Sequence, residues 1–163
     1  MRVTDLRLVR GWLHQPHVAR WFLTACTIED EIDELRHGVL GEEPTQVMLV
    51  LDGDRPVGWC QWYLCRDYPD HAVGVGADDD DVGIDYAIGE PALVGQGVGT
   101  ALIGALVQHI KSQHADAGVI ADPEAANVAS RRVLEKNGFQ LLDERSVASE
   151  PTPALMAIYR LPA

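Results

Sequence analysis

Apolar residues recur along this chain at spacings typical of helices and of strands. Near the N-terminus, and again after Thr27, they return every three or four positions, which places them on one face of a helix. The first helix carries Leu6, Val9, Trp12 and Leu13, and the second carries Ile28, Ile32 and Leu35. Thr27 is expected to cap the second helix with Asp30 as its capping-box partner, and Gly38 is expected to end it. The acidic residues between 29 and 34 are interpreted as a solvated face of this helix.

Strand-like patterns follow in the middle and at the end of the chain. Residues 47–51 and 57–65 are apolar runs on either side of a turn, which predicts an antiparallel hairpin. Further elements are expected as strands at 118–122, 139–142 and 154–161 and as a helix over 124–137. This order predicts an α+β fold with a mixed central sheet flanked by helices. With 163 residues, the chain is expected to form a single domain over residues 1–163.

The stretch Val82–Leu106 is the most informative part of the sequence. Its first eight residues alternate large side chains with small ones, which predicts a strand with one bulky and one sparse face. The bulky side chains are Ile84, Tyr86 and Ile88, and the other face carries Gly83, Asp85, Ala87 and Gly89. A strand face without bulk predicts that another group approaches it closely. An aspartate on such a face lacks the bulk of a core residue, so Asp85 is a candidate for catalysis or substrate binding, the alternative being a structural carboxylate.

A glycine-dense loop follows this strand and leads into a helix. The loop consists of Val94, Gly95, Gln96, Gly97, Val98, Gly99 and Thr100. Glycines before a helix leave backbone N–H groups uncovered at the positive end of the helix dipole, where a phosphate binds. No lysine follows, which argues against a P-loop, and the glycines are two apart, which argues against a dinucleotide fingerprint. A connector without a ligand is the alternative interpretation.

Gly97-Val98-Gly99 resembles the acetyl-CoA pyrophosphate loop of the GNAT acetyltransferase superfamily, although Val94 stands where that superfamily usually has Arg or Gln. The Gly83-Ile84-Asp85 strand, the Asp122-Pro123 turn and the segment Glu135-Lys136-Asn137-Gly138-Phe139 extend the resemblance, which covers roughly residues 81–139. Together they are similar to the aminoglycoside 6'-N-acetyltransferases in particular. The resemblance implies the GNAT fold and acetyl-CoA as co-substrate.

The resemblance also implies roles for individual residues. Asp85 matches the carboxylate proposed as the base, Asp122 a substrate-binding carboxylate, and Asn127 the side chain that meets the pantetheine arm. The expected acetyl-CoA contacts are the loop residues 94–100 together with Ala87, Ile88 and Asn127. Leu134 replaces a tyrosine proposed to protonate the leaving thiolate, which argues for a CoA-binding module without turnover. A thiol pKa of about 8.5 nevertheless makes coenzyme A a tolerable leaving group without that help.

The net charge of the chain limits the kinds of molecule that it is expected to bind. A net charge of −12 and a pI near 4.7 argue against nucleic acid and anionic membranes and favour a cationic substrate. The polar stretch 66–81 is interpreted as a loop that ends in Asp78, Asp79, Asp80 and Asp81. These four carboxylates form either a solvated segment or part of the substrate-binding site. Trp62 is expected either in the core or, as a substrate contact, on the wall of a cleft.

The remaining sequence features concern the cellular location of the protein and the possibility of a metal site. Three cysteines without a Cys-x-x-Cys spacing favour reduced thiols and a cytoplasmic location. Neither a signal peptide nor an apolar run long enough to span a membrane is expected. His14 and His17 lie one helical turn apart without a third ligand, so no metal site is expected.

Together these observations predict acetyl transfer from acetyl-CoA to an amino group of an aminoglycoside antibiotic, by resemblance the 6'-amine, an activity that confers resistance. The alternatives are a GNAT enzyme acting on another cationic amine, such as a polyamine, a lysine side chain or an amino sugar, and a CoA-binding module without turnover. A monomer and a homodimer are both compatible with the sequence.

Overall fold

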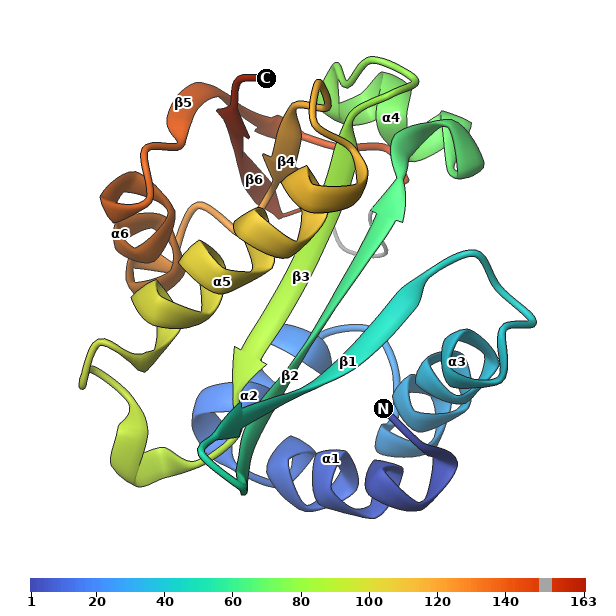
Figure 1. Cartoon of the computed structure of the whole chain (residues 1–163), viewed down its shortest axis with the longest axis vertical. Coiled ribbons are helices and arrows are strands. Elements are labelled where there is room, and N and C mark those ends of the chain that lie inside the picture. The colour runs from blue at the N-terminus through green and yellow to red at the C-terminus, as the bar shows by residue number, and fades with distance from the viewer. Residues whose placement is uncertain (150–153) are drawn as a thin grey trace.

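The computed structural model of this chain describes residues 1–149 and 154–163. Within these residues six strands form one mixed sheet in the order β1-β2-β3-β4-β6-β5 (Figure 1). The strands are β1 Gln46–Asp52, β2 Arg55–Leu64, β3 Val82–Ile88, β4 Val119–Ala121, β5 Gln140–Ser146 and β6 Leu155–Leu161. Neighbouring strands run antiparallel except β3 and β4, which are parallel. The sheet is therefore mixed, as the order of elements predicts.

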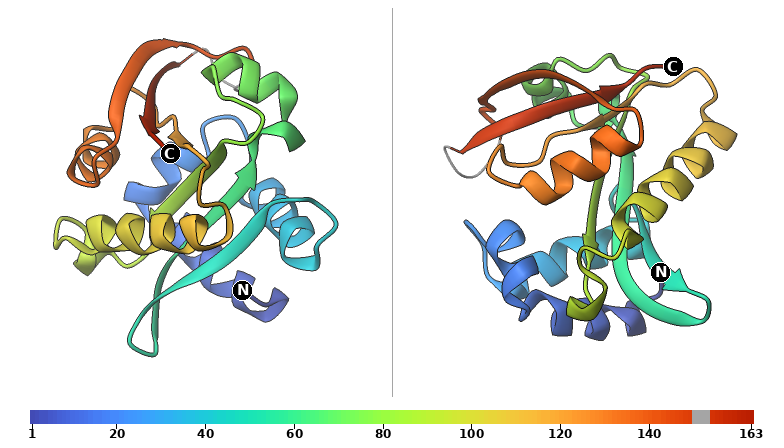
Figure 2. Two further views of the ribbon diagram at one scale, coloured as in Figure 1. Left: turned by 45° about the horizontal axis from the view of Figure 1, so that its top comes forward. Right: turned by 90° about the vertical axis from the view of Figure 1, so that its left-hand side faces the viewer.

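Helices cover both faces of this sheet. They are α1 Leu6–Leu13, α2 Pro16–Phe22, α3 Ile28–Leu40, α4 Pro69–Val75, α5 Val98–Gln113 and α6 Val128–Lys136. The first three bury their apolar stripes against β1–β3, where Trp59 and Ala87 meet Val9 and Leu35. On the opposite face, α5 and α6 share a second apolar cluster with β2, β3, β4 and β6. Figure 2 shows α5 on the side of β2 and β3 away from α1 and α2.

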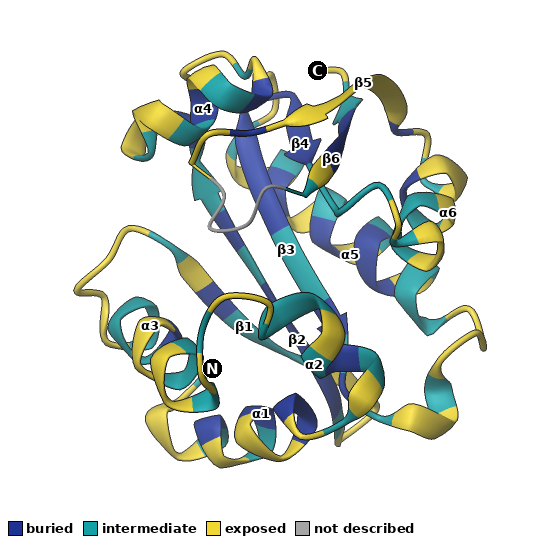
Figure 3. Ribbon diagram, turned by 180° about the vertical axis from the view of Figure 1, so that it is seen from behind, coloured by how far each residue is buried: buried dark blue, intermediate teal, exposed yellow. Residues whose placement is uncertain are grey.

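The helix α4 lies over the other end of the face that α1–α3 cover. Its Val75 packs with Ile120 of β4 and Ile158 of β6. Ile120 is the register partner of Gly83, and Gly83 shares its side of β3 with Asp85. One face of the sheet thus carries two separate groups of helices, and the stretch of β3 between them is left uncovered by either. Figure 3 shows that burial is concentrated along the central strands.

The helix boundaries confirm some expectations and correct others. The Thr27–Asp30 capping box is present, with the Asp30 N–H donating to Thr27 Oγ1 at 3.2 Å. The helix α3 ends at Leu40 with Gly41, which has a φ of +73°, as its C-cap, and Gly38 is an ordinary position inside the helix. Gly41 is the stop because the left-handed conformation that closes the last turn occurs there.

Two other segments also differ from the expectation. The stretch 66–81 contains α4, which begins with Pro69 in its first turn and ends before a left-handed Gly76. The helix α6 starts at Val128, because Glu124 forms an isolated bridge with Met156 and Asn127 caps the helix. Among the described residues, no helix has the length and apolar character that a membrane crossing requires.

Candidate active site

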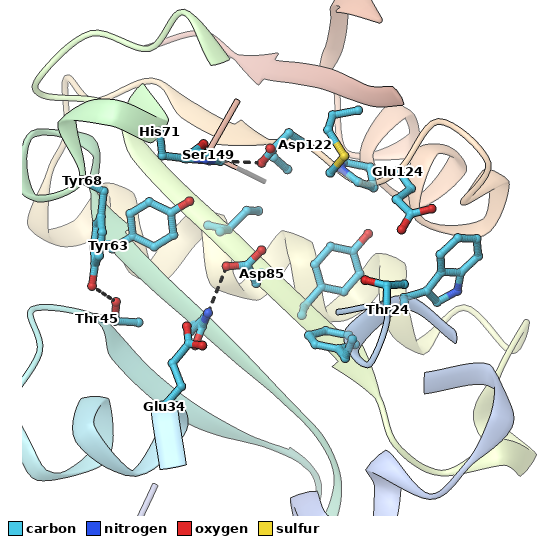
Figure 4. A pocket seen from close by; sticks show the side chains of 18 of the residues that line it. Thr24, Glu34, Thr45, Tyr63, Tyr68, His71, Asp85, Asp122, Glu124 and Ser149 are labelled. Atoms are coloured by element: carbon cyan, nitrogen blue, oxygen red, sulfur yellow. Dashed lines mark hydrogen bonds and ion pairs between the residues drawn. The ribbon is translucent and has the colours of Figure 1, made fainter. Parts of the chain in front are cut away.

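A cavity of about 810 Å³ lies on the face of the sheet between the α2–α3 region and α4. Figure 4 shows Asp85 on β3 near its centre, with Glu34 on one side and His71 and Asp122 on the other. Seven carboxylate side chains line it, from Glu31, Glu34, Asp67, Asp70, Asp85, Asp122 and Glu124. Lysine and arginine are absent from the described lining residues. Such a cavity attracts a ligand with several positive charges.

Asp85 is held in place by the neighbouring strand. Gln61 is its register partner on β2, and Gln61 Nε2 donates to Asp85 Oδ2 at 3.0 Å. Burial and, less strongly, the charge of Asp122 raise the pKa of Asp85 to about 6, although the Gln61 hydrogen bond opposes the rise. A carboxylate with this pKa is ionised at neutral pH and is a better base than an exposed aspartate.

Aromatic side chains of the chain itself fill part of the sparse face of β3. A Cβ at Gly83 would lie 2.3 Å from Tyr63 Cζ, and one at Gly89 would lie 2.1 Å from Trp12 Cδ2. The close approach expected at this face is therefore made at both ends by rings from this molecule. Between them, Asp85 faces the cavity.

Asp122 follows β4 and faces the same cavity. His71 Nε2 lies 3.6 Å from Asp122 Oδ1, and His71 Nδ1 lies 3.0 Å from Ser149 Oγ. Asp122 Oδ2 is buried without a hydrogen-bond partner among the described residues. A buried carboxylate oxygen without a donor is unfavourable, so an ammonium group that reaches it gains a strong hydrogen bond.

Glu31 and Glu34 are functional candidates that the sequence interpretation missed, because the whole acidic side of α3 was interpreted as solvated. Both line the cavity. Burial, followed by the charges of Glu34 and Asp85, raises the pKa of Glu31 to about 7. Glu34 and Asp85 thus oppose the ionisation of Glu31, and a cation bound among them would relieve this opposition.

The raised pKa of Glu31 predicts a pH-dependent gain in stability for Glu31→Gln. The carboxyl has a pKa of 4.5 in the unfolded chain and about 7 in the folded protein. Between these values the folded state holds a proton that the unfolded state has lost, so the free energy of unfolding falls as the pH rises through this window. Glutamine removes this loss, and we expect the variant to be more stable than the wild type by about 1–3 kcal/mol at pH 8, with no difference near pH 4.

Denaturant unfolding of both proteins at the two pH values measures this difference. Glu29→Gln is the matched control, because Glu29 is an exposed residue of the same helix whose pKa is lowered by a hydrogen bond from Arg10. This control should show no gain at pH 8. If Glu31→Gln shows none either, Glu31 is solvated and does not belong to the cavity.

The aspartates 78–81 do not line the cavity, although they precede β3 directly. Arg160 Nη2 lies 2.9 Å from both Asp78 Oδ2 and Asp81 Oδ1, and Asp81 is buried. Asp80 pairs with Arg66 at 3.0 Å, and Asp79 is exposed. The two arginines therefore hold this run at the far end of β3, and it is not carried into the proposed substrate site.

Trp62 is also absent from the cavity lining. It is the register partner of Ile84, so its side chain lies on the face opposite to Gln61 and Asp85. There it is 7% exposed and packs in the α5 cluster, with its ring 5.5 Å from that of His114. The aromatic residues of the cavity are Trp21, Phe22, Tyr63, Tyr68 and Tyr86.

The glycine loop and the start of α5 form a backbone site that fits a diphosphate. Gly97 is the N-cap residue with a φ of +85°, and no side chain caps this terminus. A Cβ at Gly95 or Gly97 would meet nothing within 4 Å, so the turn faces open space. Val94 and Gln96 are exposed, and the N–H groups of Val98, Gly99 and Thr100 form the first turn of α5. These groups can bind phosphate without the side chain that Val94 lacks.

The edge of β3 offers a second element for the same co-substrate. The parallel pairing with β4 covers only Val82–Val119 and Gly83–Ile120. Beyond Gly83, in the stretch that includes Ala87 and Ile88, β3 has no paired strand on its β4 side among the described residues. Asn127 lines the cavity at the start of α6, and its Oδ1 accepts from the Ser130 N–H at 3.2 Å. Its Nδ2 remains as the donor for an extended ligand along this edge.

Known proteins are similar to this chain over most of its length. Residues 2–147 match the family model described as an acetyltransferase (GNAT) domain. The aminoglycoside N(6')-acetyltransferases type 1 of Klebsiella pneumoniae and Serratia marcescens are each 26% identical over 139 residues, which is 83% of this chain and 69% of theirs.

Solved structures confirm the expected fold. Aminoglycoside acetyltransferase AAC(6')-Ib in complex with coenzyme A has a TM-score of 0.85 and 23% identity, covering 99% of this chain and 91% of that one. Its complex with coenzyme A and kanamycin gives the same values. The aminoglycoside N(6')-acetyltransferase from Legionella pneumophila has a TM-score of 0.76 and 23% identity over 99% of this chain and 88% of that one.

Proposed function

We propose that this chain, which belongs to the GNAT acetyltransferase family, acetylates an amino group of a polycationic amino sugar of the aminoglycoside class, with the 6'-amine as the expected position. The observation that carries the proposal is the set of seven carboxylates in a cavity whose described lining has no lysine or arginine. An aminoglycoside presents several ammonium groups on a rigid frame, and each of them needs an anionic partner. The names of the relatives with 26% identity support the same class.

The residues of this chain divide the chemistry between them. Asp122 and Glu34 hold ammonium groups that do not react, and the aromatic walls at Trp21 and Tyr63 contact the apolar faces of sugar rings. Asp85 accepts the proton of the reacting amine, directly or through a water molecule. The first-turn N–H groups of α5 bind the diphosphate of acetyl-CoA, which supplies the activated acetyl group when bound. Catalysis then consists largely of positioning.

A panel of amines tests the substrate class. With acetyl-CoA saturating, we expect kcat/KM for kanamycin to exceed that for spermidine or a lysine-containing peptide by about tenfold or more. A rigid array of charges loses less conformational freedom on binding than a flexible polyamine or peptide does. The assay measures release of the coenzyme A thiol, and mass spectrometry of the product locates the acetylated amine.

The other outcomes of the panel separate the alternatives. A higher kcat/KM for spermidine or the peptide would replace the aminoglycoside by another cationic amine. Tight binding of acetyl-CoA without thiol release for any amine would indicate a CoA-binding module without turnover. In this chain, the apolar Leu134 in place of the expected tyrosine favours that alternative.

A further inference from the structure

Tyr86 and Ser130 form a hydroxyl pair inside the cavity that the roles assigned above leave unused. Tyr86 Oη lies 2.7 Å from Ser130 Oγ, and either atom can be the donor. The same phenol also donates to the Ser130 carbonyl oxygen at 3.3 Å, which is a long hydrogen bond. Both residues line the cavity, Tyr86 from β3 and Ser130 from the first turn of α6. Because the serine hydroxyl can donate to the phenol oxygen, the phenol hydrogen can leave the Ser130 carbonyl and turn to a ligand while Tyr86 stays anchored.

The helix α6 has no phenol at the position expected to supply the acid for the leaving group. Leu134 occupies the position where the family resemblance would place a tyrosine, and it is fully buried in the α5 cluster. Ser130 lies four residues before it, one helical turn nearer the cavity, and so on the same side of α6. A phenol therefore reaches this region from β3, across the gap, instead of from α6.

Asp85 and Tyr86 are consecutive residues of β3, so their side chains leave the strand on opposite sides. Asp85 bonds Gln61 on the α1–α3 face, whereas Tyr86 packs against the α5 cluster. Both still reach one cavity, because β4 pairs with β3 only as far as Gly83 and leaves the edge open. A group held along this edge has a carboxylate on one side and a phenol on the other.

We infer that Tyr86, positioned by Ser130, donates a hydrogen bond to the sulfur of the departing coenzyme A thiolate. In the transfer, the amine nitrogen forms the new C–N bond, the C–S bond breaks and its electron pair stays on sulfur. The amine proton passes to Asp85 or to a water molecule beside it. The phenol keeps its own proton, since burial raises the pKa of Tyr86 to about 12, well above the value of about 8.5 for a free thiol.

This inference rests on the acetyl-CoA chemistry of the proposed function and not on the identity of the amine. Its first test therefore needs no acceptor. The ultraviolet absorbance of the thiolate is titrated against pH in complexes of coenzyme A with the wild type and with Tyr86→Phe. A hydrogen bond to the charged form favours it, so we expect the pKa of the bound thiol to be about one unit higher in Tyr86→Phe than in the wild type.

Tyr68→Phe is the matched control for this titration. It also removes a phenol from the cavity, but the Tyr68 hydroxyl bonds Thr45 Oγ1 at 2.6 Å on β1's side of the cavity. The thiol pKa should be the same in this control as in the wild type. Ser130→Ala should give a smaller increase than Tyr86→Phe, because the phenol remains but loses its anchor.

Kinetics provide the second test, with whichever amine of the panel the wild type acetylates best. We expect Tyr86→Phe to lower kcat about tenfold while the KM of the amine stays within twofold and acetyl-CoA still raises the melting temperature. An unchanged thiol pKa in Tyr86→Phe would overturn the inference, whatever the acceptor proves to be. Failure of kanamycin as a substrate, with the thiol pKa raised in the variant, would overturn only the aminoglycoside proposal.

Discussion

The variant Asp85→Asn is expected to lose about a hundred- to ten-thousandfold of kcat/KM, the range measured when a positioned general base is removed. Asparagine preserves the size of the side chain and its place beside Gln61, but it cannot take a proton from the amine. Steady-state thiol release with the best acceptor of the panel measures the loss. Acetyl-CoA should still raise the melting temperature of the variant, because its expected contacts lie on the glycine loop and the edge of β3.

The role of Asp85 as a base also predicts the direction in which activity changes with pH. In the wild type, kcat/KM should fall as the pH drops through about 6, where Asp85 becomes protonated. Asp80→Asn is the control, since Asp80 pairs with Arg66 outside the cavity. It should retain wild-type activity and pH dependence. Activity of Asp85→Asn within threefold of the wild type would remove Asp85 from the catalytic step.

The variant Gly97→Ala is expected to weaken acetyl-CoA binding about ten- to a hundredfold. Alanine at a φ of +85° is strained by about 1–2 kcal/mol, and the turn relieves the strain by rotating away from this conformation. Rotation redirects the N–H groups before α5, and each hydrogen bond lost to a charged phosphate contributes about 1.5–3 kcal/mol. Calorimetric titration with coenzyme A measures the change.

Gly53→Ala is the control that distinguishes the effect of backbone strain on stability from the loss of contacts with acetyl-CoA. Gly53 has a φ of +59° in the β1–β2 turn, and a Cβ there also meets nothing within 4 Å. Both variants should therefore lose a similar amount of stability in denaturant unfolding. Only Gly97→Ala should lose affinity, and an equal affinity in the two variants would place the diphosphate elsewhere.

Local patterns were sufficient to predict much of the fold. The apolar stripe of α1, the Thr27 capping box and the hairpin each depend on neighbours within a few residues. The helix α4 was missed because only Ala72 and Val75 of its seven residues are buried, which is too short a stripe to show a period. Its available signal was Pro69 near the start of the helix with Gly76 after its end.

The candidate site depended on information that the sequence order does not contain. Closeness in sequence suggests that the aspartates 78–81 lie beside Asp85. A strand rises about 3.3 Å per residue, however, so Asp81 lies roughly 13 Å from Asp85. The sequence leaves Trp62 either in the core or on a cleft wall. Strand alternation is the signal that decides, because it places Trp62 and Gln61 on different faces of the sheet. Glu31 lies beside the apolar stripe of Ile28, Ile32 and Leu35, and this position on the helix was the available sign that it turns inward.

The narrow junction between β3 and β4 has a mechanical consequence. Two residue pairs alone join the β1–β2–β3 unit to the β4–β6–β5 unit within the described sheet, fewer than join any other neighbouring strands. This junction has the fewest paired residues in the described sheet, and acetyl-CoA bound along the open edge of β3, as proposed, would add contacts where strand pairing is missing. We therefore expect the β1–β2–β3 and β4–β6–β5 units to be held together more firmly with the coenzyme bound than after its release.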